Sequence, residues 1–161
     1  MRTEQGSFCV VATEIGDVGI AWSDAGVTRV EIGTTLEARG PAPVWVKDLA
    51  AKIGAHFLGS VQEFRDVPLD WSAVTPFRRR VYEAARAIPS GATATYGEVA
   101  RMIGASGAAR AVGQALGKNP FGVIVPCHRV VAAGGKMGGF SAPRGVELKR
   151  KMLGIEAAFE C

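Results

Sequence analysis

Cysteine and histidine stand side by side at positions 127 and 128, directly after Pro126. The thiolate form of cysteine is the nucleophile, and a neighbouring histidine can take the thiol proton. Side chains of adjacent residues in an extended chain point to opposite faces, so His128 can serve Cys127 only through a bent backbone or a bridging water. Pro126 favours a bent entry. The pair predicts an activated thiol, with a buried structural cysteine as the alternative.

The chain has three cysteines, at positions 9, 127 and 161, and two histidines, at positions 56 and 128. The odd number and wide spacing of the cysteines do not fit a disulfide framework and favour a reducing compartment. No C-x-x-C pair is present, so we expect no metal site, and we expect no cofactor. Residues 1–9 lack the apolar core of a signal peptide, and no apolar stretch is long enough for a membrane span. We therefore expect a cytoplasmic protein without membrane contact.

Charge is distributed unevenly along the 161 residues, although the net charge is only +4. Residues 1–72 carry 6 Lys and Arg against 10 Asp and Glu, a net charge of −4. Residues 73–161 carry 13 Lys and Arg against 5 Asp and Glu, a net charge of +8. This asymmetry favours a polyanionic partner for the C-terminal half, and the alternative is an ordinary solvated basic surface.

Hydrophobic periodicity predicts different structures before and after a change of composition near residues 70–76. Before it, we expect strands over 8–12, 18–23 and 27–32, a helix over 46–58 and a short strand over 64–69. After it, Thr75 and Pro76 are typical of a helix start, and the last helix is expected over 146–157.

Two short helices are predicted between residues 95 and 117. Thr95 is a suitable cap for the first helix, and Ser106, after Gly104, for the second. Two helices joined by such a short turn form a helix-turn-helix pattern. The second helix has unusually small side chains, with Arg110 projecting alone, which permits a close approach to DNA. The alternative is a tightly packed internal helix with one surface arginine.

The segment Pro126-Cys127-His128-Arg129-Val130 resembles the active-site signature of the O6-alkylguanine-DNA alkyltransferases, also called methylated-DNA–protein-cysteine methyltransferases. The resemblance covers nearly the whole sequence and is most specific over residues 75–141. It implies an α/β (α+β) fold in two parts. Residues 1–72 would form a small ribonuclease H-like sheet with a helix, and residues 73–161 a mostly helical, winged-helix-like unit with the DNA face and Cys127.

The resemblance also implies catalytic roles. Cys127 matches the alkyl acceptor, and His128 matches the residue that deprotonates it through a water. Glu156 matches the acid that orients the histidine, as a carboxylate does in other nucleophile–base–acid triads. Asn119 matches the asparagine that ties down the turn carrying the active site. Tyr96 matches the tyrosine that helps to rotate the target nucleotide and hydrogen-bonds its base.

Further residues are expected to contact DNA or the damaged base. Arg110 matches the arginine that enters the base stack after the guanine has left. The expected DNA-binding residues are Arg110, Tyr96, Thr95, Ala109, Gln114 and Arg129. The expected substrate pocket is formed by Phe140, Ser141, Met137 and Gly138. Phe140 stands where many family members have tyrosine, so its ring can pack against the base without offering a hydroxyl.

The implied activity is repair by direct reversal: a single, irreversible transfer of an alkyl group to Cys127 from O6-alkylguanine in double-stranded DNA. O4-alkylthymine is an alternative substrate. The nucleotide must be flipped out of the duplex, because the O6 atom lies inside it. We expect a monomer in solution, with either independent or cooperative binding along DNA.

Three other functions compete with this interpretation. A lesion-binding protein without transfer activity would lack the acceptor cysteine. A transcription regulator would carry more base-reading side chains on its second helix than Arg110 and Gln114. A cysteine hydrolase would turn over repeatedly and would need an oxyanion hole. Stoichiometry separates them, since the alkyltransferase accepts at most one alkyl group per molecule.

Overall fold

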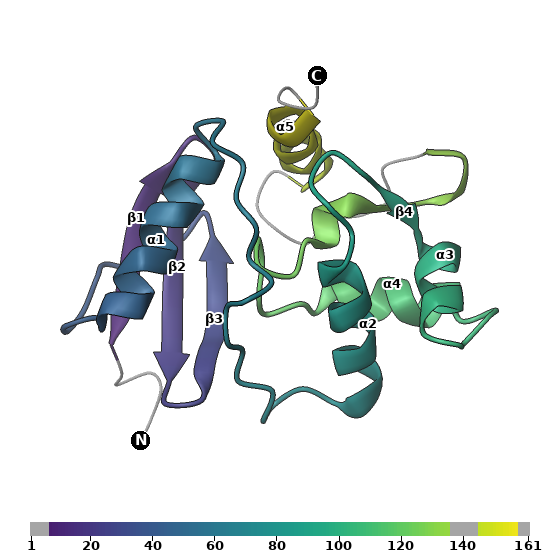
Figure 1. Cartoon of the computed structure of the whole chain (residues 1–161), viewed down its shortest axis with the longest axis horizontal. Helices are drawn as coiled ribbons and strands as arrows, with labels where there is room; N and C mark the ends of the chain where they lie inside the picture. Colours follow the sequence, from purple (N-terminus) through teal and green to yellow (C-terminus); the bar gives the residue numbers. More distant parts are fainter. Residues whose placement is uncertain (1–6, 136–144, 158–161) are drawn as a thin grey trace.

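The computed structural model describes residues 7–135 and 145–157. Its N-terminal half is an antiparallel meander of β1 (Phe8–Thr13), β2 (Gly16–Ser23) and β3 (Gly26–Ile32), with α1 (Val44–His56) packed against one face (Figure 1). Alternate apolar side chains of the strands, such as Val18 and Ile20, are fully buried. The three predicted strands and the helix are confirmed, because their order follows from short turns between neighbours in the sequence.

The second half of the chain is mostly helical. Its elements are α2 (Pro76–Arg86), β4 (Ala94–Thr95), α3 (Tyr96–Met102), α4 (Ala109–Gly117), the 3-10 turn η2 (Cys127–Arg129), β5 (Val130–Val131), the 3-10 turn η3 (Ala133–Gly135) and α5 (Gly145–Ala157). Thr75 caps α2 by accepting a hydrogen bond from the Arg78 N–H. Thr95 and Glu98 form a reciprocal capping box at the start of α3. The predicted α+β class is confirmed.

Two predicted elements differ from the structure. Residues 64–69 form no strand, and only an isolated bridge joins Leu69 to Val27. The helix predicted from Ser106 begins at Ala109, with Ala108 at its N-cap and no side-chain capping bond. Gly107 has a φ of 90°, which keeps the chain in a turn after Ser106 and delays the helix.

An arginine explains why residues 64–69 are not a strand. The Arg86 Nη2 atom, at the end of α2, donates to the carbonyl oxygens of Phe64, Arg65 and Val67 at 2.7, 2.9 and 3.0 Å. These carbonyls are therefore occupied by a side chain rather than by a neighbouring strand. The linker between the two halves is held on α2, close to the boundary predicted at residues 72 and 73.

The free edge of β3 is covered by the C-terminal half and the linker. The Val30 N–H donates to the Pro120 carbonyl at 2.8 Å, and the Val27 N–H donates to the Pro68 carbonyl at 2.9 Å. Apolar side chains from both halves belong to one continuous core, in which Phe121 is fully buried. The loop that leads to Cys127 is thus attached to the N-terminal sheet. No described helix has the length and apolar character needed to cross a membrane.

Candidate active site

The loop before Cys127 makes two very tight turns. Val123 has a φ of 73°, and the N–H of the next residue donates to the carbonyl of the preceding residue at 2.9 Å, which forms a classical γ-turn. Pro126 has φ −80° and ψ 68°, and the Cys127 N–H donates to the Val125 carbonyl at 2.8 Å, which forms an inverse γ-turn. A β-branched residue at positive φ is strained and persists only where its surroundings hold it. The predicted bent entry to Cys127 is confirmed.

Asn119 holds this loop from within. Its side-chain Nδ2 donates to the Val125 carbonyl at 3.0 Å, and its Oδ1 accepts from the Phe121 N–H at 2.9 Å. After η2 the chain enters β5, which pairs in parallel with β4, so Val131 lies opposite Thr95. Because Tyr96 directly follows Thr95, this pairing places the start of α3 beside the turn that carries Cys127.

His128 is buried and contacts Glu156 through its Nε2 atom at 2.8 Å. A carboxylate only accepts hydrogen bonds, so Nε2 carries the proton in this contact. In a neutral ring, Nδ1 is then left with its lone pair, and it has no hydrogen-bond partner among the described residues. Burial lowers the pKa of His128, although Glu156 acts in the opposite direction. The ring is therefore ready to accept a proton at Nδ1 near neutral pH.

Glu156 is completely buried and accepts hydrogen bonds from three side chains. Besides His128, it receives a bidentate contact from Arg129, with Nε–Oε1 and Nη2–Oε2 distances of 2.9 Å, and one from His56 at 3.0 Å. Burial alone would raise the pKa of Glu156, but these hydrogen bonds hold it well below its usual range. The carboxylate is thus a permanent negative charge behind the histidine.

The expectation that Arg129 contacts DNA is wrong. Only 5% of its surface is exposed. Besides Glu156, its guanidinium donates to the Ile88 carbonyl at 2.6 Å and to the Ser90 hydroxyl at 2.7 Å. A buried arginine needs hydrogen-bond partners, and here the protein itself supplies at least one for each guanidinium nitrogen. Arg129 is the counter-ion of Glu156.

Cys127 is half-buried at the first position of η2. Burial raises the pKa of its thiol, while the Asn119 amide and the Lys149 ammonium act in the opposite direction. The thiol is therefore mostly protonated at neutral pH, and it needs a base to react quickly. The histidine behind it has the free lone pair that such a base requires.

Two further side chains, Lys149 and Tyr96, interact electrostatically with Cys127. Lys149 of α5 is only 1% exposed, and its Nζ lies 6.0 Å from the centre of the Tyr96 ring. Burial lowers the pKa of Lys149, and the negative charge of a Cys127 thiolate raises it. Burial and the Cys127 charge both raise the pKa of Tyr96, so its hydroxyl keeps its proton. Sequence reasoning missed Lys149, because only burial distinguishes it from its neighbours Arg150 and Lys151.

Removing the Lys149 charge should make Cys127 less reactive. We expect Lys149→Met to raise the thiol pKa and to slow alkylation by iodoacetamide about tenfold at neutral pH, since a nearby cation favours the thiolate. Methionine keeps the length of the side chain without the charge. The matched control is Lys151→Met on the same helix, whose ammonium bonds to the Glu14 carbonyl instead. Equal rates for both variants across pH would contradict this assignment.

In the helix-turn-helix pair, α3 lies at the outer edge of the C-terminal half, and α4 lies between α3 and α2 (Figure 1). Arg110 and Gln114 are exposed on α4, and Ala109 and Tyr96 are partly exposed. Arg110, Arg101 and Lys118 have no ion-pair or hydrogen-bond partner among the described residues. The Thr95 hydroxyl is engaged in its helix cap. The exposed cations of this pair are thus available to an external anion.

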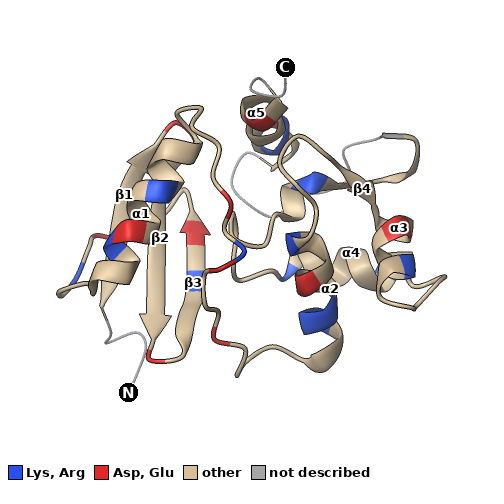
Figure 2. Ribbon diagram, viewed as in Figure 1, with Lys and Arg blue, Asp and Glu red and all other residues tan. Residues whose placement is uncertain are grey.

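Several cations of the C-terminal half already have partners within the protein, some of them at its surface. Lys and Arg occur on α2, α3 and α5 (Figure 2). Arg79 pairs with Glu83 and lies over Trp71, and Arg86 and Arg129 bind backbone carbonyls. The net charge of this half therefore overstates the positive charge that is free to meet an external anion, and Arg101, Arg110 and Lys118 are among the cations without a partner in the described part of the chain.

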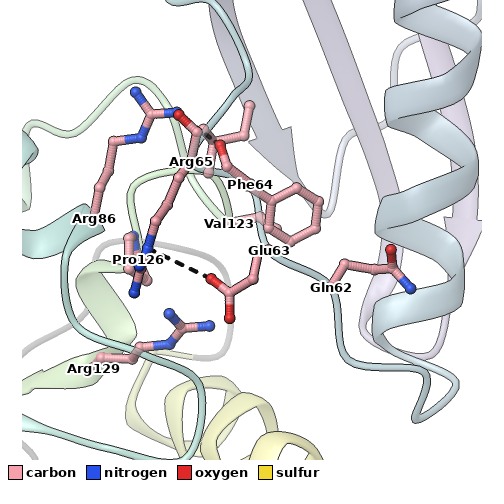
Figure 3. A pocket seen from close by; sticks show the side chains of 9 residues that line it. Gln62, Glu63, Phe64, Arg65, Arg86, Val123, Pro126 and Arg129 are labelled. Carbon is pink, nitrogen blue, oxygen red and sulfur yellow. Dashed lines mark hydrogen bonds and ion pairs between the residues drawn. The ribbon is translucent and has the colours of Figure 1, made fainter.

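The residues expected to form the substrate pocket, Phe140, Ser141, Met137 and Gly138, lie outside the described residues. A cavity behind Pro126, between the linker and Arg129, has a volume of only about 10 Å³ (Figure 3). That is room for about one water and excludes a purine base. A larger cavity of about 540 Å³ lies between Leu58, after α1, and Ile155 of α5, and neither Cys127 nor His128 lines it.

These features define a class of protein: a helix-turn-helix pair beside a cysteine nucleophile that is supported by a buried histidine and carboxylate. Residues 76–158 match the family described as 6-O-methylguanine DNA methyltransferase, DNA binding domain. Because this match covers more than half of the chain, the protein belongs to that family. The predicted family is confirmed.

Known proteins resemble the chain beyond this segment. A methylated-DNA–protein-cysteine methyltransferase of Mycolicibacterium paratuberculosis is 48% identical over 105 residues, 65% of this chain and 61% of that protein's length. A DNA base-flipping protein of Thermus thermophilus is 39% identical over 138 residues, 84% of this chain and 91% of that protein. The crystal structure of Mycobacterium tuberculosis OGT in complex with DNA has a TM-score of 0.81 and 38% identity, over 94% of this chain and 92% of that one. The fold is therefore shared along almost the whole chain.

Proposed function

We propose that this protein repairs alkylated DNA by moving the alkyl group from the O6 atom of a damaged guanine to Cys127, once per molecule. The observation that carries the proposal is the arrangement behind the thiol: His128 is buried, its Nε2 contacts Glu156, and its Nδ1 has no partner within residues 7–135 and 145–157. Family membership supports a methyltransferase that acts on DNA. O4-alkylthymine is a second substrate to test.

The proposed reaction moves one alkyl group and one proton. The Cys127 thiol gives its proton to His128 Nδ1 through a water, and the resulting imidazolium is balanced by the Glu156 carboxylate. A bond forms between Sγ and the alkyl carbon, and the bond from that carbon to O6 breaks. The O6 atom keeps the electron pair, and guanine is restored when it takes up a proton, which we assign to the Tyr96 hydroxyl. Tyr96 is then reprotonated by the proton that His128 took from the thiol, so no proton is gained or lost overall.

The product explains why the protein acts once. The alkyl group ends in a thioether, which thiol exchange does not reverse. A cysteine hydrolase would instead release its product and recover the thiol. The T. thermophilus relative described as a base-flipping protein suggests a third outcome, in which the damaged base is bound without transfer. The presence of Cys127 favours transfer.

The proposed DNA contact uses α4, with α3 in support. The flipped nucleotide leaves a gap in the base stack, and Arg110 is the longest side chain on a helix of mostly small residues. Arg101 and Lys118 would contact phosphates, which makes binding salt-dependent and nearly independent of sequence. In this proposal residues 73–161 bind DNA and carry the acceptor, and residues 1–72 support them. We propose a cytoplasmic monomer with access to the chromosome, and titration of DNA length would show whether binding is cooperative.

Mass spectrometry after incubation with duplex DNA containing one O6-methylguanine tests the proposal. We expect one added methyl group per molecule, located on the Cys127 peptide, and plain guanine in the DNA. Repeated release of product would support a hydrolase. Tight binding of the lesion with no change in mass would support a base-flipping sensor.

Replacing Arg110 should affect transfer from duplex DNA more than transfer from a free base. We expect Arg110→Ala to slow transfer from duplex O6-methylguanine ~10-fold to ~100-fold, because the few kcal/mol needed for flipping are no longer offset. Transfer from free O6-benzylguanine, which needs no flipping, should be unchanged. Lys118→Ala, at the end of the same helix, removes the same charge and should only weaken binding. An equal loss on both substrates would count against the role of Arg110.

A further inference from the structure

His56 links the N-terminal half of the protein to the buried carboxylate of the candidate site. It is the last residue of α1 and is only 1% exposed. Its ring packs edge-on against Phe57 and Phe64, with ring centres 4.8 and 5.4 Å apart. Its Nε2 atom lies 3.0 Å from Glu156 Oε2, across 100 residues of sequence. From the sequence we assigned no role to His56, since we expected no metal site, so this contact was missed.

The direction of this hydrogen bond is determined by the other ring nitrogen. His56 Nδ1 accepts the backbone N–H of Gln62 at 2.9 Å, so it cannot carry a proton in this arrangement. Nε2 must then carry the proton and donate to Glu156. Aromatic packing and the fixed backbone of the linker hold the ring in this orientation, and His56 is therefore a preorganised donor.

His56 and His128 donate to the same oxygen atom. Oε2 of Glu156 accepts from both histidines and from Arg129 Nη2, at 3.0, 2.8 and 2.9 Å. Each additional donor withdraws negative charge from the carboxylate and makes it a weaker acceptor for the others. A weaker acceptor stabilises the protonated form of His128 less, and the neutral form that can take a thiol proton is favoured.

We propose that His56 is a positioning residue for alkyl transfer, which holds Glu156 in place and limits the basicity of His128. The N-terminal half would thereby take part in the chemistry, through a side chain that touches neither the thiol nor the substrate. This inference rests on the proposed function, since it concerns the base of that reaction.

The groups around His128 are consistent with this role. Three charged or titratable side chains act on His128. They are Glu156 from α5, Arg129 from η2 and His56 from α1. Burial lowers the pKa of His128, Glu156 raises it, and Arg129 and His56 lower it further. Removing His56 should therefore raise the pKa of His128 and leave less neutral imidazole at a given pH.

The test compares His56→Leu with wild type in single-turnover transfer from duplex O6-methylguanine over a range of pH. The amplitude reports the folded, active fraction, and the rate constant reports the chemistry. We expect the rate constant at neutral pH to fall about tenfold, which is the size of effect expected when a hydrogen bond to a charged group is lost. We also expect the pH at which the rate has fallen to half its maximum on the acid side to move to a higher value. His56→Gln keeps an N–H donor and should recover much of both.

A variant with a purely structural effect serves as the control. Ile53→Val removes one buried methyl group from the same helix and keeps every hydrogen-bonding group of the cluster, so it should lower stability without changing the rate constant or the midpoint. If His56→Leu behaves in the same way, with reduced amplitude only, the inference is overturned. Failure of wild type to transfer any methyl group would instead reject the proposed function itself.

Discussion

Replacing Cys127 with serine should abolish alkyl transfer and preserve lesion binding. Serine has almost the shape of cysteine, but its hydroxyl ionises far less readily than a thiol, and His128 is a weak base for it. We expect no methyl group on the variant by mass spectrometry, even at long incubation, while its affinity for duplex O6-methylguanine stays within a few fold of wild type. A stable complex with the intact lesion should form.

Cys9 provides the matched control for this experiment. It is also half-buried, and burial raises the pKa of its thiol, but it lies in β1, at the opposite edge of the sheet from β3, the strand that bonds to the C-terminal half. Cys9→Ser should transfer one methyl group at the wild-type rate. Continued methylation of Cys127→Ser would show that another side chain is the acceptor, and it would contradict the assignment of Cys127 as the alkyl acceptor.

Neutralising Glu156 should produce the largest loss of stability. Glu156→Gln leaves the buried guanidinium of Arg129 without its counter-ion, and such a change costs about 3–5 kcal/mol of the free energy of unfolding. This is a large fraction of the ~5–15 kcal/mol that stabilises a typical domain. Transfer should also slow ~10²-fold to ~10⁴-fold, since the imidazolium of His128 loses its stabilising charge. Urea denaturation and single-turnover kinetics measure the two effects.

The pH dependence of stability supplies a second readout of the same cluster. The pKa of Glu156 is lowered in the folded protein, so its contribution is complete above the ordinary value of 4.5 and is lost as the pH falls below it. The pKa of His128 is also lowered, so the unfolded chain binds a proton below 6.5 that the folded protein resists. Both groups therefore make the folded protein less stable in acid. Glu156→Gln should remove the share of this pH dependence that is seen below pH 4.5.

An exposed ion pair gives the control for the stability experiment. Arg79 and Glu83 are in contact at 3.2 Å on the surface of α2, with about half of each side chain exposed. Such a pair contributes ~0.3–0.5 kcal/mol, so Glu83→Gln should hardly change the urea midpoint at any pH. Equal shifts of the urea midpoint in the two variants would mean that the hydrogen bonds of Glu156 contribute no more to stability than a surface ion pair.

Features that depend on a few neighbouring residues were predictable from the sequence. Thr75 and Thr95 cap their helices as expected, because each hydroxyl bonds to a backbone N–H three residues further on. The meander and the bent entry at Pro126 were also predictable, since short turns and the restricted φ of proline act locally. The pairing of His128 with Glu156 was expected only from the family resemblance.

Features that depend on distant partners were not predictable in this way. Residues 64–69 were expected to form a short strand, but the carbonyls of Phe64 and Val67 accept hydrogen bonds from Arg86, a residue of the following helix. Arg129 belongs to the acceptor motif and was expected to contact DNA, but it is buried between Ser90 and Glu156. In both cases an arginine found backbone or carboxylate oxygens inside the protein.

The sequence by itself determined the nature of the chemistry: a thiol beside a histidine at positions 127 and 128, and one long cation, Arg110, on a helix of small residues. Only the tertiary structure decided what supports that chemistry. It placed Glu156 between His128 and His56, which is 100 residues away from the carboxylate in sequence. The physical reason is desolvation: a buried charge must be matched by donors from whichever elements pack around it, and no local pattern records which elements those are.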